Sequence, residues 1–403
     1  MRRKICLITG SRAEYGHLRW IARTIAQDPR CTLQLLVTGM HLEARFGETW
    51  QEIRDDGHVI DATVPMDESD DNPTGVARSM GRGLAGMAEA LERLAPDIAV
   101  ILGDRFEMMA AAQAAMLTCT PIAHIHGGET TEGAMDEAVR HSITKMAHLH
   151  FTAAGPYARR VAQIGEDPTR IYAFGAPGLD AIQMGDTPSP AQLSREIGFD
   201  CTRPFFLVTY HPATLSDGDP DAEVTEVLAA LGDCPNYGIL ITGVNADTGN
   251  TAVERAYQRF ASAVPDRTQV VAHLGQRRYI AALAACAACV GNSSSGLIEA
   301  PALGVPSVNV GPRQQGRLRG ATVIDCAPRR DSVGAAVARA LDPAFREATT
   351  GLPAPYGQGG VSRRIVEVLA TVNLHGILTK RFHDVSMSRE DLDWDQSHSD
   401  EIS

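Results

Sequence analysis

The sequence predicts an α/β protein with two Rossmann-like domains that face each other across a central cleft. Short apolar segments alternate with amphipathic helical patterns, which is typical of parallel sheets with helices on both faces. The alternation breaks at FGAPGLD (174–180) and then restarts for a second run of similar length. The 403 residues are enough for two or three domains, and 44% hydrophobic residues can bury a large core.

The apolar segments define the expected strands in order. In the first run they are KICLIT (4–9), LQLLVT (33–38), DIAVIL (97–102), PIAHIH (121–126), LHFTA (149–153) and RIYAF (170–174). In the second run they are FFLVTY (205–210), YGILITG (237–243), TQVVAHL (268–274), ACVGN (288–292), PSVNVG (306–311) and ATVID (321–325). Helical patterns lie between strands at 17–28 and 83–95, and a further one at 189–198 precedes the second run.

The break and a later linker divide the chain. We expect an N-terminal domain at 1–178, which carries the acid/base turns, and a C-terminal domain at 179–360. GLPAPYGQGG at the end of the second domain is typical of a linker, and a helix is predicted after it at 361–372. The last stretch, 383–403, is polar, acidic and without periodicity, so it is predicted to be disordered.

Composition argues against several partners. The formal net charge of −12 disfavours nucleic acid and anionic membranes, because both favour a basic surface. The apolar run ICLI near the start is too short for a signal peptide, and no apolar run has the length of a membrane span. The eight cysteines are scattered, and besides Cys286 and Cys289 no second pair stands at zinc spacing. We therefore expect a reduced, soluble, cytoplasmic protein that binds neither nucleic acid nor membrane.

Acidic residues and histidines gather in the turns after the strands of the first run. Ligands of open α/β sheets bind outside the carboxyl ends of the strands, so chemistry is expected in these turns. Asp104 ends one predicted strand, and Asp136 begins a helix further on. His124 and His126 end the strand between them, two residues apart and so on the same face. His211 ends the first strand of the second run and would face them across the cleft.

Each of these residues also has a purely structural interpretation. Asp104 could cap a helix, and Asp136 could pair with Arg140 four positions on. A histidine at the end of a strand is often a hydrogen-bonded fixture. Their joint position on one edge of one sheet nevertheless favours general acid/base chemistry, which needs such clustering to shift pKa values.

The turn GNSSSGLIEAPALG (291–304) is predicted to bind a diphosphate. It follows a strand and opens a helix, so Ser293, Ser294 and Ser295 would lie with free N–H groups at a positive helix end. Glu299, further along this helix, could accept hydrogen bonds from ribose hydroxyls. A serine N-cap and a solvated glutamate would explain the same residues.

Arginines in other turns suit phosphate as well. Arg12 lies in the first turn, SRAEYG, and Arg313 and Arg317 lie in the turn RQQGR. A guanidinium donates two hydrogen bonds to one phosphate, although an exposed loop arginine is usually only solvated. The chain has no G-x-G-x-x-G after its first strand and no Walker A motif, which disfavours NAD and P-loop ATP chemistry.

A metal-dependent hydrolase is an alternative for the histidine-rich turn. Plausible zinc ligands are present there, namely His124, His126, Asp104 and His141. The H-x-H strand, however, lies in the middle of a doubly wound pattern, and a metal site would leave the serine-rich turn without a function. We therefore expect neither a metal nor another cofactor.

The motifs of the chain resemble a known family. The hydrolysing UDP-N-acetylglucosamine 2-epimerases of bacterial sialic-acid synthesis share with it, in the same order, TGSRAEYG, VTGMH, LGDRFE, HIHGGE, DEAVRHSITKMAHLHF, the HP of YHPAT, NADTG, GNSSSGLIEAPALGVPSVNVGPRQQGR and RGATVID. A sister group, which looks much alike, acts on UDP-2,4-diacetamido-2,4,6-trideoxyglucose on the way to legionaminic acid. The resemblance covers nearly the whole chain except the acidic tail.

The resemblance implies the glycosyltransferase-B architecture, in which the second domain holds most of the UDP and a C-terminal helix, here 361–380, crosses back to the first. It also implies a two-step reaction without a cofactor. UDP leaves C1 while the C2 proton is removed, which gives a 2-acetamidoglucal by anti elimination. Water then adds to C1, and C2 is reprotonated on the opposite face. The implied products are UDP and N-acetylmannosamine for sialic-acid-type sugar synthesis, and the implied assembly is a homodimer or homotetramer.

Site residues are implied by the same motifs. Asp104 and Asp136 match acids implicated in proton transfer, and His211 matches a histidine near the diphosphate. Some members have a catalytic-candidate glutamate where this chain has His126, so His126 or Glu129 would take its part, and the base and the acid stay unassigned. Nucleotide or substrate contacts are matched by Arg12, Asn245, Ser293, Ser294, Glu299 and Arg313.

Three alternatives stay open beside epimerisation of UDP-N-acetylglucosamine. The first is the same reaction on the diacetamido sugar, because the sequence does not determine the C4 and C6 groups. The second is a sugar transferase of the same fold, which would need at most one base among the acid-rich turns. The third is a nucleotide-sugar-binding module, which would not need Asp104 and Asp136 together.

Overall fold

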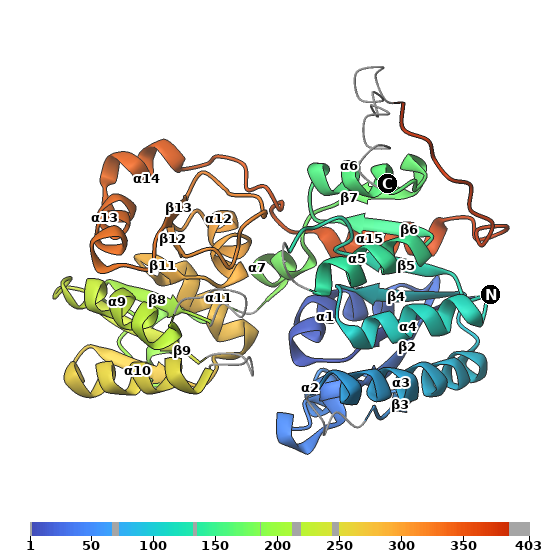
Figure 1. Ribbon diagram of the computed structural model, residues 1–403, viewed down its shortest axis with the longest axis horizontal. Helices are drawn as coiled ribbons and strands as arrows, with labels where there is room; N and C mark the ends of the chain where they lie inside the picture. The colour runs from blue at the N-terminus through green and yellow to red at the C-terminus, as the bar shows by residue number, and fades with distance from the viewer. Residues whose placement is uncertain are drawn as a thin grey trace, which may run out of the picture.

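The protein consists of two α/β domains, each built on one parallel sheet, as the computed structural model shows (Figure 1). The structure describes residues 2–66, 72–131, 135–185, 187–211, 219–243 and 250–386. The predicted fold class is confirmed. Parallel strands leave apolar faces on both sides of a sheet, and helices cover them in each domain.

The first sheet has seven strands in the order β3-β2-β1-β4-β5-β6-β7. Its strands are β1 (Arg3–Thr9), β2 (Cys31–Thr38), β3 (Ala62–Val64), β4 (Ile98–Leu102), β5 (Ile122–Ile125), β6 (Leu149–Thr152) and β7 (Ile171–Ala173). The helices among them are α1 (Arg12–Gln27), α2 (Trp50–Asp55), α3 (Pro73–Leu94), α4 (Phe106–Leu117), α5 (Met135–Met146) and α6 (Gly155–Gln163). The short edge strand β3 is the one strand of this sheet that the apolar pattern did not predict.

The second sheet has six strands in the order β10-β9-β8-β11-β12-β13. Its strands are β8 (Phe205–Thr209), β9 (Gly238–Thr242), β10 (Thr268–Val271), β11 (Ala288–Gly291), β12 (Ser307–Val310) and β13 (Val323–Cys326). The remaining helices are α7 (Asp180–Met184), α8 (Pro190–Ile197), α9 (Pro220–Gly232), α10 (Asn250–Ala263), α11 (Gly275–Ala285), α12 (Glu299–Ala302), α13 (Arg330–Leu341), α14 (Pro343–Thr349) and α15 (Val361–Thr371). Every predicted strand of this run is present, with ends that differ by a few residues.

The last helix, α15, packs into the core of the first domain, beside α1 (Figure 1). Ile365 and Leu369 are fully buried there, and Arg3 of β1 donates a hydrogen bond of 2.7 Å to the carbonyl oxygen of Leu369. The buried Asp180 of α7 accepts hydrogen bonds from the N–H groups at the start of α15. The chain therefore returns to the first domain after building the second. The exact domain boundaries stay predictions.

Two further sequence expectations concern the ends of this architecture. Within the described ranges, no helix is both long and apolar enough to cross a membrane. Residues 383–386 form no helix or strand, and residues 387–403 of the acidic tail lie outside the described part of the chain.

Candidate active site

Four of the predicted site residues follow strands at the switch points of the two sheets. The strand order reverses between β1 and β4 in the first sheet and between β8 and β11 in the second. Asp104 comes two residues after β4, and Arg12 begins the helix after β1. His211 and Ser293 come two residues after β8 and β11. Switch points are where open α/β sheets bind ligands, so the topology brings the predicted chemistry to two facing positions.

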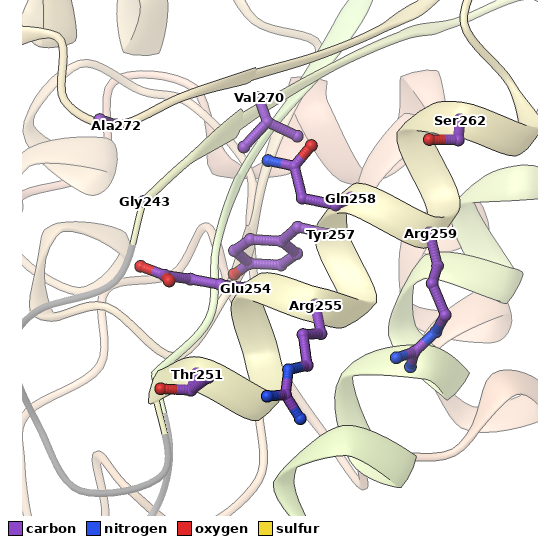
Figure 2. Close-up of a pocket in the computed structure, with 10 residues that line it drawn as sticks. All are labelled: Gly243, Thr251, Glu254, Arg255, Tyr257, Gln258, Arg259, Ser262, Val270 and Ala272. Atoms are coloured by element: carbon purple, nitrogen blue, oxygen red, sulfur yellow. The ribbon is translucent and has the colours of Figure 1, made fainter.

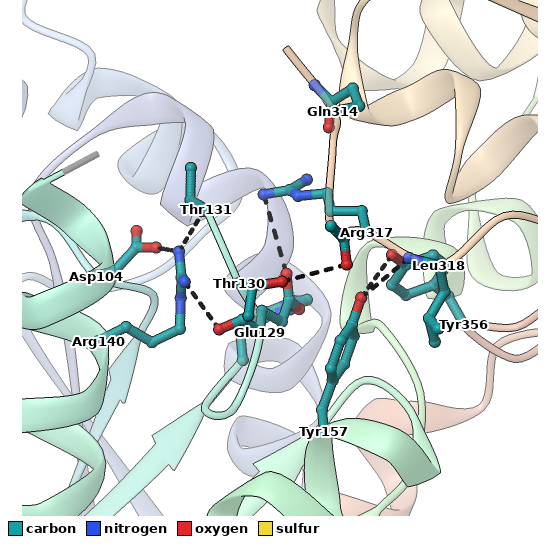
Figure 3. Close-up of polar contacts among 12 residues, drawn as sticks. Asp104, Glu129, Thr130, Thr131, Arg140, Tyr157, Gln314, Arg317, Leu318 and Tyr356 are labelled. Atoms are coloured by element: carbon teal, nitrogen blue, oxygen red, sulfur yellow. Dashed lines mark hydrogen bonds and ion pairs between the residues drawn. The ribbon is translucent and has the colours of Figure 1, made fainter. Parts of the chain in front are cut away.

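Asp104 is held by a buried arginine (Figure 3). Arg140 of α5 is 2% exposed and pairs with the Asp104 carboxylate. Its guanidinium also donates to the Thr131 hydroxyl at 2.8 Å, to the carbonyl oxygen of Glu129 at 3.0 Å and to the Glu137 carboxylate at 2.8 Å. One arginine thus fixes the turn after β4, the turn after β5 and the first turn of α5. The sequence offered Arg140 as a partner for Asp136, but its carboxylate partners are Asp104 and Glu137.

Asp136 lies at the exposed start of α5, and none of the described residues hydrogen-bonds to it. Partial desolvation and the neighbouring Asp104 carboxylate raise the pKa of Asp136 above its ordinary value. The two predicted carboxylates are therefore close enough to interact, with one paired and one available. This is the arrangement that an acid/base site needs.

His126 occupies a strained backbone position at the end of β5. Its φ is 68°, which histidine adopts less readily than glycine, and strained residues of this kind cluster at functional sites. The imidazole Nδ1 lies 2.5 Å from Oε1 of Glu129, which is buried. The glycine pair that follows allows this turn, because a Cβ on Gly128 would collide with the carbonyl oxygen of Tyr157 at 2.3 Å.

The turn after β5 contacts the second domain directly (Figure 3). Glu129 faces Arg317 across the domain boundary, with Oε2 and Nη2 3.9 Å apart. Thr130 donates a hydrogen bond of 3.2 Å to the carbonyl oxygen of Gly316. The hydroxyl of Tyr157 accepts the N–H of Leu318 at 3.4 Å. The predicted acid/base turn and the predicted RQQGR turn therefore form one interface.

On the second domain, Asn292 ties the predicted phosphate turns together. Its side chain accepts the N–H of His211 at 2.7 Å and donates to the His211 carbonyl oxygen at 2.8 Å. Its own carbonyl oxygen accepts from Arg313 at 3.2 Å and from Gln314 at 2.8 Å. Burial and the Arg313 charge lower the pKa of His211 to about 4, so this histidine is neutral at pH 7. Asn292 was not predicted, although it opens the serine-rich turn.

The serine-rich turn differs in one respect from the expected helix N-terminus. Ser294–Gly296 form a single 3₁₀ turn, and α12 has only four residues, beginning at Glu299. Ser293 caps the 3₁₀ turn by accepting the N–H of Ser295 at 3.4 Å. Proline within EAPALG cannot extend a long helix, so the dipole argument is weaker here than the sequence suggested. Burial raises the pKa of Glu299, which senses His126 and Arg317 across the boundary.

Arg12 is peripheral to these contacts, and Asn245 cannot be placed relative to them. Arg12 is exposed and lies 3.9 Å from the Glu52 carboxylate, and its charge is felt by His273 of the second domain. Asn245 lies outside the described residues.

Sequence reasoning missed two further residues at this edge, both on α1. Glu14 is buried and accepts the N–H of Gly10 at 2.7 Å, while burial and then Glu107 raise its pKa to about 8. His17 lies edge to face with His126, with ring centroids 5.9 Å apart. Burial, followed by His126, lowers the pKa of His17 to about 4. Both lie in the first two turns of α1, close to the strand ends.

The metal alternative finds little support in the geometry. Both ring nitrogens of His124 are engaged, with the carbonyl oxygen of Gly103 at 2.8 Å and the Thr144 hydroxyl at 3.1 Å. His141 lies 2.9 Å from the Glu137 carboxylate instead. Across the described ranges, no three His, Cys, Asp or Glu side chains are grouped to hold a metal ion.

A hollow of about 1020 Å³ lies elsewhere on the second domain, along α10 (Figure 2). Glu254, Arg255 and Arg259 of α10 line part of it. Its described lining includes none of the predicted site residues, so we place the candidate active site at the domain boundary.

Carboxylates thus follow strands of one Rossmann-like domain, and turns rich in serine and arginine follow strands of the other, in a glycosyltransferase-B-like fold. Residues 23–370 match the family described as UDP-N-acetylglucosamine 2-epimerase, and the chain belongs to this family. It is therefore an enzyme of the UDP-sugar 2-epimerase class, as the motifs predicted.

Relatives and a solved structure agree with this assignment. The chain is 36% identical to the hydrolysing UDP-N,N'-diacetylbacillosamine 2-epimerase of Legionella pneumophila, over 94% of this chain and 99% of the relative. It is 32% identical to the hydrolysing GDP/UDP-N,N'-diacetylbacillosamine 2-epimerase of Campylobacter jejuni, over 95% of this chain and 100% of the relative. The structure of Neisseria meningitidis UDP-GlcNAc 2-epimerase bound to UDP-GlcNAc has a TM-score of 0.77 at 17% identity, over 91% and 99% of the two chains, which shows the shared fold.

Proposed function

We propose that this protein is a hydrolysing 2-epimerase of UDP-N,N'-diacetylbacillosamine, whose sugar is 2,4-diacetamido-2,4,6-trideoxyglucose. In the first step the C2–H bond breaks, its electron pair forms the C1=C2 bond, and UDP leaves C1 with the electron pair of the C1–O bond. In the second step water adds its oxygen to C1, and C2 gains a proton on the opposite face. The products are UDP and a free sugar of manno configuration.

One observation carries the proposal: the acid-rich turn and the phosphate-type turn meet through Glu129 and Arg317. The proton on C2, beside an acetamido group, is very weakly acidic. It can therefore be removed only as the diphosphate departs from C1. An enzyme for this step needs donors for the leaving diphosphate and proton carriers for C2, both at one sugar ring. A transferase or a binding module would not need the second set.

The proposed roles follow the positions of the side chains. Asp104 and Asp136 carry protons at C1 and C2, with Asp136 the less constrained of the two. On the other side, the diphosphate and the nucleoside are assigned to His211, Arg12, Asn245, Ser293, Ser294, Ser295, Glu299 and Arg313. Neutral His211 and a serine turn can donate hydrogen bonds to a diphosphate, and Arg313 adds charge.

The relatives support the diacetamido sugar ahead of UDP-N-acetylglucosamine. The two hydrolysing relatives above carry diacetylbacillosamine in their names and align over nearly the whole chain. The UDP-N-acetylglucosamine 2-epimerase of Neisseria meningitidis aligns with a smaller share of this chain, 80%, at 29% identity. UDP-N-acetylglucosamine epimerisation on the route to sialic acid therefore stays the second candidate. The Campylobacter name also includes GDP, so the nucleotide requires the same comparison.

The decisive experiment offers the protein UDP-N,N'-diacetylbacillosamine, its GDP analogue and UDP-N-acetylglucosamine separately in D₂O. We expect nucleotide release to be fastest with the UDP diacetamido sugar, and the free sugar to carry deuterium at C2 in manno configuration by NMR. Faster turnover of UDP-N-acetylglucosamine would reverse the order of the two candidates. A product with unchanged C2 configuration and no deuterium would contradict the mechanism with either sugar.

We also propose that the protein forms a homodimer or homotetramer, as the resemblance of its motifs to the family implies. Light scattering coupled to gel filtration measures this directly. A monomer of 43.1 kDa would contradict it.

A further inference from the structure

The histidine at the end of β5 has one engaged ring nitrogen and one buried, unengaged nitrogen. Nδ1 of His126 lies 2.5 Å from Oε1 of Glu129. Nε2 is shielded from solvent and has no hydrogen-bond partner among the described residues. A buried polar atom without a partner is costly, and such atoms in native proteins call for a functional explanation. The ring lies at the domain boundary, beside His17 of α1.

The carboxylate behind this ring is anchored on three sides. Oε1 of Glu129 faces His126, Oε2 faces Arg317 of the second domain at 3.9 Å, and the backbone oxygen binds Arg140 at 3.0 Å. Burial opposes ionisation of Glu129, but His126, Arg317 and Arg140 outweigh it and lower its pKa to about 2. Such a carboxylate is a weak base. It is suited to orienting an imidazole and stabilising its charged form.

We propose that His126 and Glu129 form a carboxylate–imidazole dyad in which Nε2 of His126 exchanges a proton with C2 of the sugar, and that Arg317 of the second domain completes the dyad. This assignment rests on the proposed function. His126 is the catalytic residue, whereas Glu129 and Arg317 are positioning residues that act through it. The Nδ1–H group donates to Glu129, which leaves the Nε2 lone pair as the acceptor for a proton, as in other carboxylate–histidine pairs.

The surroundings explain how a histidine can act as the proton carrier in this turn. When Nε2 takes a proton, Glu129 stabilises the imidazolium that forms. The total charge of the pair then changes from −1 to 0, as the charge of a single carboxylate does when it is protonated. Three other groups face the ring region, namely neutral His17, Glu299 and Arg317. Arg317 comes from the RQQGR turn next to Arg313, so the dyad is complete only when the two domains are together.

The first test needs no substrate. Two-bond ¹H–¹⁵N correlation NMR on histidine-labelled protein distinguishes the two neutral tautomers, and His126→Gln identifies its signal among the 13 histidines. We expect the Nδ1–H tautomer of His126 in the wild-type protein and a changed tautomer ratio in Glu129→Gln. An Nε2–H tautomer in the wild-type protein would overturn the dyad, because Nε2 could then not accept a proton.

The second test is a double-mutant cycle on nucleotide release. We expect His126→Gln and Glu129→Gln each to lower kcat by about 10²-fold or more with little change in KM, and Glu129→Gln to cost less than about threefold in the His126→Gln background. His126→Glu should restore part of kcat, because it supplies a carboxylate at the same position. Additive losses, or no rescue by glutamate, would overturn the dyad.

Arg317 has a matched control in the same domain. Arg317→Lys should lower kcat at least about tenfold, because a lysine ammonium differs in reach and hydration from the guanidinium that faces Oε2 of Glu129 at 3.9 Å. Arg329→Lys changes an exposed arginine paired 3.4 Å from Asp331 and should leave kcat unchanged. Equal kcat in both variants would remove Arg317 from the dyad. If the wild-type protein releases no nucleotide from any sugar, the proposed function fails, while the tautomer measurement still judges the dyad.

Discussion

Arg140→Lys tests the residue that connects the turn after β4, the turn after β5 and the start of α5. The guanidinium makes four contacts, two of them to carboxylates, and it is 2% exposed. Lysine keeps the charge but has three donors on one atom, so it cannot span Asp104, Thr131 and Glu137 at once. Losing the charge-assisted bond that orients Asp104 corresponds to about 1.5–3 kcal/mol.

The loss translates into rate if Asp104 acts in the reaction. A penalty of this size lowers kcat by about 10- to 100-fold, since about 1.4 kcal/mol is tenfold. KM should change by less than about threefold, because none of the proposed nucleotide contacts that the structure describes is a partner of Arg140. The assay is continuous detection of UDP release, with Arg30→Lys as the control for an exposed arginine that also pairs with two carboxylates. An Arg140→Lys enzyme with wild-type kcat, or one with raised KM and unchanged kcat, would refute this reasoning.

Three further predictions follow from the described side chains. Asp104→Asn should lower turnover by at least about 10²-fold while UDP binding, measured by calorimetry, is retained; near-normal turnover would remove Asp104 from proton transfer. Burial and Glu107 raise the pKa of Glu14 to about 8. The protonated carboxyl therefore contributes its full stability below about pH 4.5, and this contribution is lost as the pH rises to 8. Glu14→Gln should raise the melting temperature relative to wild type more at pH 9 than at pH 5. Burial opposes ionisation of Glu166, but its partners, Lys380 among them, lower its pKa to about 2. The ionised carboxylate therefore stabilises the fold above about pH 4.5, and this stabilisation is lost towards pH 2. The destabilisation caused by Glu166→Gln should shrink over that range, and a constant difference in melting temperature between the variant and the wild type would contradict this.

The sheets were predictable because parallel strands buried on both faces are nearly continuous apolar runs. β8 is FFLVT and β4 is IAVIL, and both are fully buried. The edge strand β3 was missed, because three residues with one exposed position give almost no apolar pattern. The N-terminal half of α3 was missed as well. Its glycines and serine weaken the helical pattern, and Asn72 caps it through a local side-chain bond.

The candidate site was predictable where chemistry follows a strand end. Asp104, His126 and Ser293 were found this way because the carboxyl ends of parallel strands share one edge. Arg140 was assigned a local partner because spacing along a helix is visible in sequence. Its contact with Asp104 depends instead on how α5 packs against α4 and β5. Glu14 and His17 were missed for a related reason, since the burial of Glu14 near Glu107 and of His17 beside His126 is a tertiary property.

The central claim is that the phosphate-type turns and the proton carriers act on one sugar ring. A crystal structure with bound UDP-N,N'-diacetylbacillosamine tests it most directly. We predict the diphosphate against Arg313 and the serine-rich turn, with C1 and C2 of the sugar facing Asp104 and Nε2 of His126. A diphosphate bound there with the sugar directed away from both side chains would contradict the account.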